Sequence, residues 1–576
     1  MPPSVAGIDE VYDVNTISPS AVHDIIGPLD FSGPANPIGL LADLQLEPWI
    51  KSLAYTQGGA EYAWSILRSP TTDTEIIRAR TDFAKLLPSD GLASTMNVFK
   101  STESAVLWLQ RLPAMKDAWP LPLLFPLWPV LRLSNRIPIA LDLFHLYRGY
   151  IAPCMHVIYP LTSMIAPFFY MRKTMKMKIA LQTYLSWIKV ALKTLLRLSG
   201  DLKHDLIRLA IAGTYAFVFF YGLIQSIEIA SMIRSIRRDL LAKRDQIEQF
   251  MNAARPIRVL GNEVTRNVPT IPKGMSGVYA LWNNLNGIRD KVTAVAREVY
   301  VLDTATIVHR LLSNGYCVPK FADNTGTGSQ ASPTKFWDMG HPLLKQSQKT
   351  NPVSLERNII ITGPNAAGKT TYMKAVAANS ILAQTLGVCY ASKAIVNPVT
   401  FFGSFVRVTD EVGTASLFEA EVQRCTELLA TSKIVSENGY TSLLFLDEPM
   451  HSTPPIEGAS TAMAVIEALG KMPGVRVLAT THYHDMVALE ESAPDLYRNV
   501  SMEAIAPDAP SASSASSAPS GVFKFPYTLR RGPSFQCIAL ELLRERELPE
   551  DVFRSAIEFK KQICKRVVKC SETESS

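Results

Sequence analysis

Three short apolar runs in the C-terminal half of the chain follow the pattern of buried strands. Residues 358–362 (NIIIT), 442–448 (SLLFLDE) and 475–482 (VRVLATTH) are rich in aliphatic side chains and end in polar ones. Runs of this length are typical of parallel strands with both faces covered. The first run is followed, after a glycine loop, by a helical pattern over residues 371–386. We therefore predict an α/β domain in this half of the chain.

Two segments in the first half are unusually apolar. Leu209–Ile227 has 19 residues without a charge, close to the ~20 that a helix needs to cross a bilayer. Gly149–Met171 is uncharged for 23 residues but contains three prolines, which weaken it as a straight spanning helix. The pattern favours a membrane hairpin or anchor over the alternative, a helix pair buried in a core or in a dimer interface.

The segment between these two, residues 172–208, is basic. It carries nine Lys or Arg and two Asp. Lys189, Lys193 and Arg197 recur every four residues beside Trp187, which places the three cations on one helix face. Such a face suits solvent, an anionic membrane surface or DNA phosphates. If both apolar segments crossed a bilayer, the cations between them would lie across the membrane from the rest of the chain, against the positive-inside tendency. One spanning segment, or a hairpin that lies in the plane of the membrane, is therefore also compatible with the sequence.

Composition narrows the class of protein. Apolar residues make up 47% of the 576 residues and charged residues 19%, which excludes a wholly disordered chain. The net charge of +6 is too small for a general polyanion binder but permits a local basic patch. The seven cysteines contain no Cys-x-x-Cys pair, which disfavours a zinc site or a disulfide framework. Residues 1–15 lack a secretory pattern, so we expect an intracellular, reducing compartment.

A glycine loop, Gly363-Pro-Asn-Ala-Ala-Gly-Lys-Thr370, stands between the first predicted strand and the helix that follows. Glycines at this spacing let backbone N–H groups close on phosphates, while the lysine reaches the β and γ oxygens and the threonine hydroxyl ligates Mg²⁺. The loop therefore predicts a nucleotide-phosphate site. Its expected contacts are Gly363, Pro364, Asn365, Gly368, Lys369, Thr370 and Thr371.

The other two strands end in candidate catalytic groups. Asp447 and Glu448 close the second strand, an arrangement that puts one carboxylate on the metal and the other near an attacking water. His482 closes the third strand, at the carboxyl end where ligands of open α/β sheets bind. A single histidine there is more often structural, but in this series we expect it to sense the γ-phosphate.

These motifs resemble the ATPase domain of the MutS family, the mismatch-repair ATPases of the ABC superfamily. The resemblance covers about residues 335–500 and continues after a gap. The similar stretches are Thr362–Met373, Leu382–Gly387, Asp410–Glu421, Leu446–Glu448, Thr453–Gly458 and Ala479–Tyr483, with Gly340–Leu343, Leu529–Ser534, Ile538–Leu540 and Leu548–Val552 beside them. Trp49–Arg80 and Val292–Leu312 resemble parts of the family's helical core. The implied fold is an α-helical core and lever region plus an α/β P-loop ATPase domain of the ABC type.

The resemblance also implies cofactors, partners and roles. ATP and Mg²⁺ would bind at the P-loop, and Ser416 would reach into the ATP site of a second subunit. We expect a homodimer or heterodimer through the ATPase domains, and DNA as a partner. The apolar segments add an expected membrane contact through residues 149–227. Where the family has a Gly-Arg-Gly-Thr run after its paired acids, this chain has Pro449–Thr453, so we expect altered dimer contacts and turnover. Only 48 residues precede Trp49 and no Phe-x-Glu occurs, so mismatch reading by the family's wedge is not expected.

Polar and proline-rich breaks suggest the domain organisation. We expect an irregular extension at 1–44, a helical region at 45–320 with an apolar insert at 149–227, an ATPase domain at 335–505, a flexible loop at 506–521, and the rest of the ATPase domain with a helical tail at 522–576. The expected function is ATP binding and hydrolysis with a DNA role in repair or recombination, without a nuclease motif. A membrane-attached ATP switch acting on lipid or protein, or a nucleotide-binding scaffold with little turnover, are the alternatives.

Overall fold

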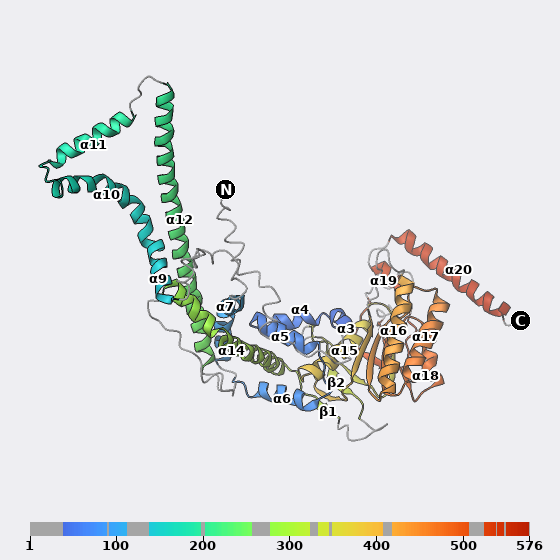
Figure 1. Ribbon diagram of the computed structural model, residues 1–576. Helices are drawn as coiled ribbons and strands as arrows, with labels where there is room; N and C mark the ends of the chain where they lie inside the picture. The colour runs from blue at the N-terminus through green and yellow to red at the C-terminus, as the bar shows by residue number, and fades with distance from the viewer. Residues whose placement is uncertain are drawn as a thin grey trace, which may run out of the picture. The chain divides into compact units, whose positions relative to one another are not determined.

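The computed structural model falls into two compact units (Figure 1). Among the described residues, the helical unit is Ser94–Val299, and the sheet unit contains the residues up to Ala93 together with those from Tyr300 onward. The structure describes residues 38–88, 91–111, 137–196, 202–255, 277–322, 332–344, 348–406, 417–505, 523–536, 538–545 and 549–574. The expected loop at 506–521 lies outside these ranges, and the expected domain boundaries stay a prediction.

The helical unit is built from long helices. They are α7 (Leu92–Arg111), α9 (Pro138–Leu146), η3 (Tyr147–Ile151), α10 (Ala152–Lys173), α11 (Leu181–Leu196), α12 (Leu202–Ala254) and α14 (Val278–Ser313), of which α7 and α14 also contribute to the sheet unit. Its core lies where α7, the end of α12 and α14 bring apolar side chains together, with the Phe99 and Phe250 ring centroids 5.0 Å apart.

The predicted apolar segments lie in α10 and in the first half of α12. By length and composition, the described residues contain two helices able to cross a membrane, Ile139–Lys173 and Lys203–Ala254. The most apolar windows of these helices are only 11% and 0% buried. A long apolar helix in a soluble protein is mostly buried, and these are not covered by the described part of the chain.

The sheet unit contains a six-stranded sheet in the order β10-β9-β4-β8-β7-β6. Its strands are β4 (Asn358–Thr362), β6 (Phe401–Phe405), β7 (Ser442–Asp447), β8 (Val475–Thr480), β9 (Tyr497–Met502) and β10 (Leu529–Arg531), and all but β10 are parallel to their neighbours. The three strands predicted from apolar runs are confirmed, and β7 and β8 end one and two residues before the predicted ends. A second sheet has the order β1-β5-β2-β3 and consists of β1 (Lys320–Phe321), β2 (Lys335–Met339), β3 (Asn351–Ser354) and β5 (Lys393–Val396).

Helices cover both faces of the six-stranded sheet. Because side chains alternate along a strand, Leu444 and Leu446 of β7 share one face, where they pack with α16 (Leu417–Glu437) and α17 (Pro455–Gly470). Helix α15 (Lys369–Thr385) contacts β7 and β8 but contributes no side chain to that cluster, so it covers the other face. The α/β architecture is therefore as predicted.

Further helices belong to the sheet unit. They are α3 (Ile38–Asp43), α4 (Leu46–Leu53), α5 (Gln57–Leu67), α6 (Thr74–Lys85), η4 (His484–Val487), α18 (Ala488–Ser492), α19 (Ala539–Glu545) and α20 (Glu550–Glu574). Within the sheet unit, Asp303 of α14 fixes the start of α5. Its buried carboxylate accepts hydrogen bonds from the Thr56 hydroxyl and the Thr56 backbone N–H, each at 2.7 Å. Burial raises the pKa of Asp303 although these bonds oppose the shift.

His341 is held in its neutral form between β2 and β3. Its Nδ1 accepts a hydrogen bond from the Leu343 N–H at 3.2 Å, and its own backbone N–H donates to Gln348 Oε1 at 2.7 Å. Burial and the nearby Lys374 charge lower the pKa of His341 to about 4. A protonated ring would lose the acceptor on Nδ1, which agrees with the direction of the shift.

This arrangement predicts acid sensitivity at one residue. In the unfolded chain a histidine has a pKa near ~6.5, so between about pH 6.5 and 4 the unfolded state binds more protons and the stability of the native state falls as the pH falls. The variant His341→Asn keeps an acceptor but does not titrate. The thermal midpoint of the wild type relative to H341N should drop between pH 7.5 and 5, by an amount equivalent to about 1–2 kcal/mol. A pH-independent difference would contradict the assignment.

Candidate nucleotide-binding site

The parallel register of the sheet brings the three predicted motifs to one edge. Ile361 of β4 pairs with Thr480 of β8, and Thr480 pairs with Asp447 of β7. Residues that follow these positions therefore emerge side by side at the carboxyl ends of neighbouring strands, where open α/β sheets bind ligands.

Two glycines shape the P-loop between β4 and α15. Gly363 has φ 142° and Gly368 has φ 98°, values that L side chains rarely adopt. A Cβ on Gly363 would also meet the Met502 carbonyl oxygen at 2.0 Å. The loop can therefore close only with glycine at these two positions, as the motif predicts.

Lys369 begins α15 and points back into its own loop. Its Nζ donates to the carbonyl oxygens of Gly363 at 2.9 Å and Pro364 at 3.2 Å, and its side chain is only 4% exposed. Burial lowers the pKa of Lys369, while the Glu448 and Asp447 carboxylates oppose that shift. The ammonium thus lies inside the loop, where its positive charge can attract phosphate oxygens.

Thr370 and Asp447 place two oxygens together next to the P-loop. The Thr370 hydroxyl donates to Asp447 Oδ1 at 2.9 Å, and Thr480 Oγ1 donates to the same atom. Mg²⁺ usually takes one or two protein oxygens and completes its shell with phosphates and water, so this pair fits the ion. No cluster of three or more His, Cys, Asp or Glu suited to a metal occurs among the described residues.

Glu448 turns from the end of β7 toward the same point. Its φ is 49°, and its N–H donates to the carbonyl and hydroxyl oxygens of Thr480, both at 3.1 Å. Its Oε1 lies 2.5 Å from His482 Nε2 and 4.0 Å from Lys369 Nζ. Burial alone would raise the pKa of Glu448, but the His482 hydrogen bond and the charges of His482, Lys369 and His451 bring it below its usual value. The carboxylate is therefore kept ionised.

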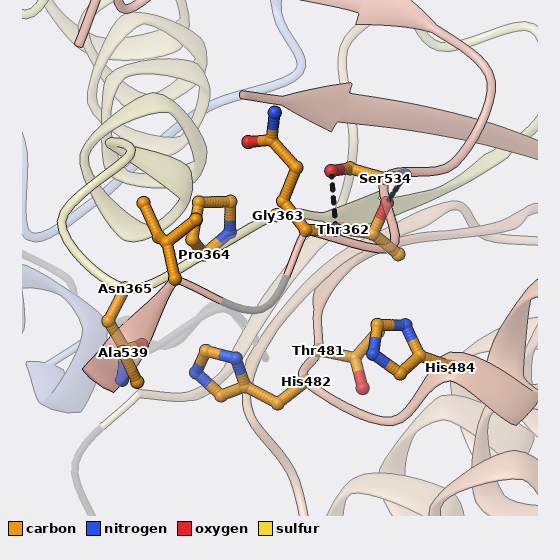
Figure 2. A pocket seen from close by; sticks show the side chains of 11 residues that line it. Thr362, Gly363, Pro364, Asn365, Thr481, His482, His484, Ser534 and Ala539 are labelled. Carbon is orange, nitrogen blue, oxygen red and sulfur yellow. Dashed lines mark hydrogen bonds between the residues drawn. The ribbon is translucent and has the colours of Figure 1, made fainter. Parts of the chain in front are cut away.

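A cavity of about 200 Å³ opens next to the P-loop (Figure 2). Among the predicted residues, Gly363, Pro364, Asn365 and His482 line it. Thr371, one residue after Thr370, has an exposed side chain. Ser416 lies outside the described residues, so its predicted reach into a second subunit stays a prediction.

Several residues at this site were not identified from the sequence. Ser534 lines the cavity, and its N–H donates to Thr362 Oγ1 at 2.7 Å (Figure 2). Gln536 and His484 line the same cavity. Thr480 holds both Asp447 and the Glu448 N–H. Ser534 and Thr480 stand in stretches that carry the family resemblance, but only the folded sheet shows their contacts.

The segment after Glu448 is fastened by a buried carboxylate. Glu421 of α16 has no exposed side-chain surface. Its Oε2 accepts a hydrogen bond from the Ser452 hydroxyl at 2.6 Å, and its Oε1 lies 2.7 Å from His451 Nδ1. Met450 is buried with φ 62°, and its carbonyl oxygen accepts a hydrogen bond from Tyr483 Oη at 2.9 Å. These contacts hold a left-handed backbone that a non-glycine residue otherwise disfavours.

Comparison with known proteins identifies the same region. The family model of MutS domain V matches residues 359–564. The chain is 26% identical over 283 residues to the DNA mismatch repair protein MutS of Bacillus velezensis, covering 47% of this chain and 30% of that protein. It is 28% identical over 206 residues to MutS of Bacillus subtilis, covering 36% and 22%, and 34% identical over 151 residues to MutS of an Exiguobacterium species, covering 26% and 17%.

The chain therefore spans less than a third of the length of these curated relatives. The matched segment contains the P-loop, the paired acids and His482, which the sheet brings to one edge. Its helices and sheet agree with the fold that the motifs predicted. Residues 359–564 are therefore a P-loop domain of the MutS domain V type.

Proposed function

We propose that this chain binds ATP with Mg²⁺ at the P-loop and hydrolyses it. The observation that carries the proposal is the convergence of Lys369, Asp447 and Glu448 at one sheet edge, with Lys369 Nζ 4.0 Å from Glu448 Oε1. A buried cation, a metal-type oxygen pair and an ionised carboxylate are the three parts that phosphoryl transfer to water needs.

Each side chain has a distinct task in this proposal. Lys369 exchanges its two loop carbonyls for β- and γ-phosphate oxygens, and Thr370 with Asp447 holds the metal. Bound Mg²⁺ supplies charge neutralisation of the phosphates. Glu448 orients the attacking water, and His482 keeps this carboxylate ionised and placed beside the γ-phosphate. Because Lys369 approaches the phosphates and Glu448 approaches the water, binding and hydrolysis can be separated by mutation.

We expect Lys369→Ala and Glu448→Gln to differ. Loss of the lysine removes a charge-assisted phosphate contact, so ATP affinity should fall by about tenfold or more. The glutamine keeps the shape of Glu448 but not its charge, so affinity should stay within about threefold while turnover falls by about a hundredfold. Equilibrium binding of ATP and steady-state phosphate release measure the two effects. An equal loss of affinity in both variants would contradict the assigned roles, and Glu437→Gln on α16 is an exposed control.

The contacts of Glu421 help to decide between ATP hydrolysis and the alternative, a nucleotide-binding scaffold with little turnover. Counting back from Thr453, Met450 stands where the family's run has its first glycine and His451 where it has arginine. In this chain His451 and Ser452 meet the buried carboxylate instead. We propose that Glu421 thereby fixes the segment that carries Glu448, and that the chain retains turnover despite the changed residues.

The variant Glu421→Ala tests this role. It removes the acceptor of Ser452 and leaves the left-handed Met450 backbone without that anchor, so kcat should fall by about tenfold or more while ATP affinity changes little. Glu437→Ala, an exposed carboxylate on the same helix, should leave kcat unchanged. Phosphate release under saturating ATP is the measurement. Absence of turnover in the wild type as well would favour the scaffold.

A DNA role in repair or recombination, with dimerisation through the ATPase domains, is the wider function we propose. It is supported by the similarity to MutS of Bacillus velezensis and Bacillus subtilis, which are DNA mismatch repair proteins. We further propose an intracellular location, consistent with the cysteines at 154, 317, 389 and 425 being free thiols.

Mismatch preference is a separate matter, because no Phe-x-Glu wedge motif occurs in this sequence. We expect a G·T duplex and the matched homoduplex to bind within about tenfold of each other, which is ~1.4 kcal/mol. Competition binding at fixed salt measures the ratio. A larger preference for the mismatch would show that other residues read it.

A second candidate function is a membrane-attached ATP switch acting on lipid or protein. The specific observation that favours it is the exposure of two membrane-length helices in the helical unit.

A further inference from the structure

Helices α10, α11 and the first half of α12 form what we term the apolar frame, residues 152–230. Its large apolar side chains are exposed along the whole length of each helix. The most exposed are Tyr159, Leu161, Phe169 and Tyr170 on α10, Leu185, Trp187 and Val190 on α11, and Leu206, Tyr215, Phe217, Val218 and Phe220 on α12. An apolar surface of this extent marks an interaction site.

The frame is open because its helices meet only near their ends. A Cβ added at Gly222 of α12 would meet His156 Nε2 of α10 at 3.2 Å, so these helices lie close at the start of α10. The end of α10 instead packs on α11, where Tyr184 Oη donates to the Met164 carbonyl at 2.7 Å and the Phe168 and Tyr184 rings are 5.3 Å apart. Pro160 and Pro167 lie within α10, and the helix leaves α12 along its course (Figure 1).

The exposed apolar positions on α12 surround the helix. Successive residues of an α-helix are rotated by ~100°, so Tyr215, Phe217, Val218 and Phe220 point in four different directions. Each of these four side chains is at least 58% exposed. A helix that docks on a protein groove carries one apolar stripe, whereas a helix apolar on all sides belongs in a core or in lipid. The described residues supply no core around it.

Charge along the frame is mostly positive. Residues 152–230 contain nine Lys or Arg and three Asp or Glu. The bend between α10 and α11 encloses a cavity of about 400 Å³ lined by Arg172, Lys176 and Lys178 with neighbouring apolar residues. On α11, Lys189 and Lys193 are exposed one turn apart, while Trp187 and Val190 are exposed in other directions around the helix. A cationic rim beside apolar and Trp side chains is the composition of helices that lie at an anionic membrane surface.

We propose that the apolar frame inserts into an anionic lipid bilayer, with its aromatic and aliphatic side chains in the acyl region and the cations of residues 172–193 at the headgroup phosphates. This inference deepens the membrane-attached candidate function and does not depend on ATP turnover. DNA would engage the same lysines through phosphates but would leave the exposed rings of α12 in water. A second copy of the chain would bring the same excess of cations from the matching segment.

Flotation of the full chain with vesicles tests the proposal. One set of vesicles is phosphatidylcholine alone and the other is an equal mixture with phosphatidylglycerol. We expect flotation with the anionic set, weakened at high salt. The variant Lys189→Gln/Lys193→Gln should weaken binding to anionic vesicles by roughly fivefold per lysine and leave the neutral set unchanged. Phe217→Ser/Phe220→Ser should weaken binding to both sets by roughly tenfold or more per residue.

Matched controls come from the sheet unit. Ile456→Ser replaces an apolar side chain on α17 at a residue that is 84% exposed, and Lys433→Gln replaces an exposed cation on α16. Neither should change flotation. ATP turnover of every variant is measured without lipid, so a failure of the proposed ATPase function is seen separately from a failure of membrane insertion.

Three results would overturn the inference. The first is an intact protein that stays monodisperse without detergent and does not float with anionic vesicles. The second is salt-dependent binding of duplex DNA that K189Q/K193Q abolishes, without flotation. The third is a stable oligomer that F217S/F220S dissociates, again without flotation.

Discussion

The parallel pairing of β4, β8 and β7 is the constraint on which the candidate site depends. Thr480 sits between Ile361 and Asp447 in the register, and its hydroxyl donates to Asp447 while accepting from the Glu448 N–H. A slip by one residue would turn these side chains to the opposite face of the sheet. The buried aliphatic residues of the three strands therefore secure the geometry of the candidate site as well as the stability of the sheet.

The sequence predicted the parts of this site that depend on local spacing. The three strands, the glycine loop and the paired acids follow from short runs of residues, and the structure places them as expected. Glu421 and Ser452 could not be paired in this way, because the helix and the segment that bring them together are separated by β7. Hydropathy located the apolar helices but could not tell whether they are buried, since a core helix and a lipid-facing helix have the same composition.

The two units differ in how much of their polar and apolar surface is paired or buried. In the sheet unit, buried polar groups such as Asp303 and Glu421 meet hydrogen-bond donors from other elements, so each fixes two pieces of chain relative to each other. In the apolar frame, the described helices meet at few points and leave their rings exposed. The sheet unit is thus fixed by contacts within itself, whereas the described residues leave the apolar surface of the frame uncovered.

Lys369 has a consequence for nucleotide selection. Its ammonium already has two carbonyl partners within the loop, so an entering nucleotide must displace them and gains only the difference between two sets of oxygens. Neutral carbonyls lose this exchange to the charged oxygens of a triphosphate, because the ammonium attracts a full negative charge more strongly than a carbonyl dipole. A nucleoside monophosphate offers no oxygen at the β or γ position. The loop carbonyls therefore act as an internal competitor that discriminates by phosphate number.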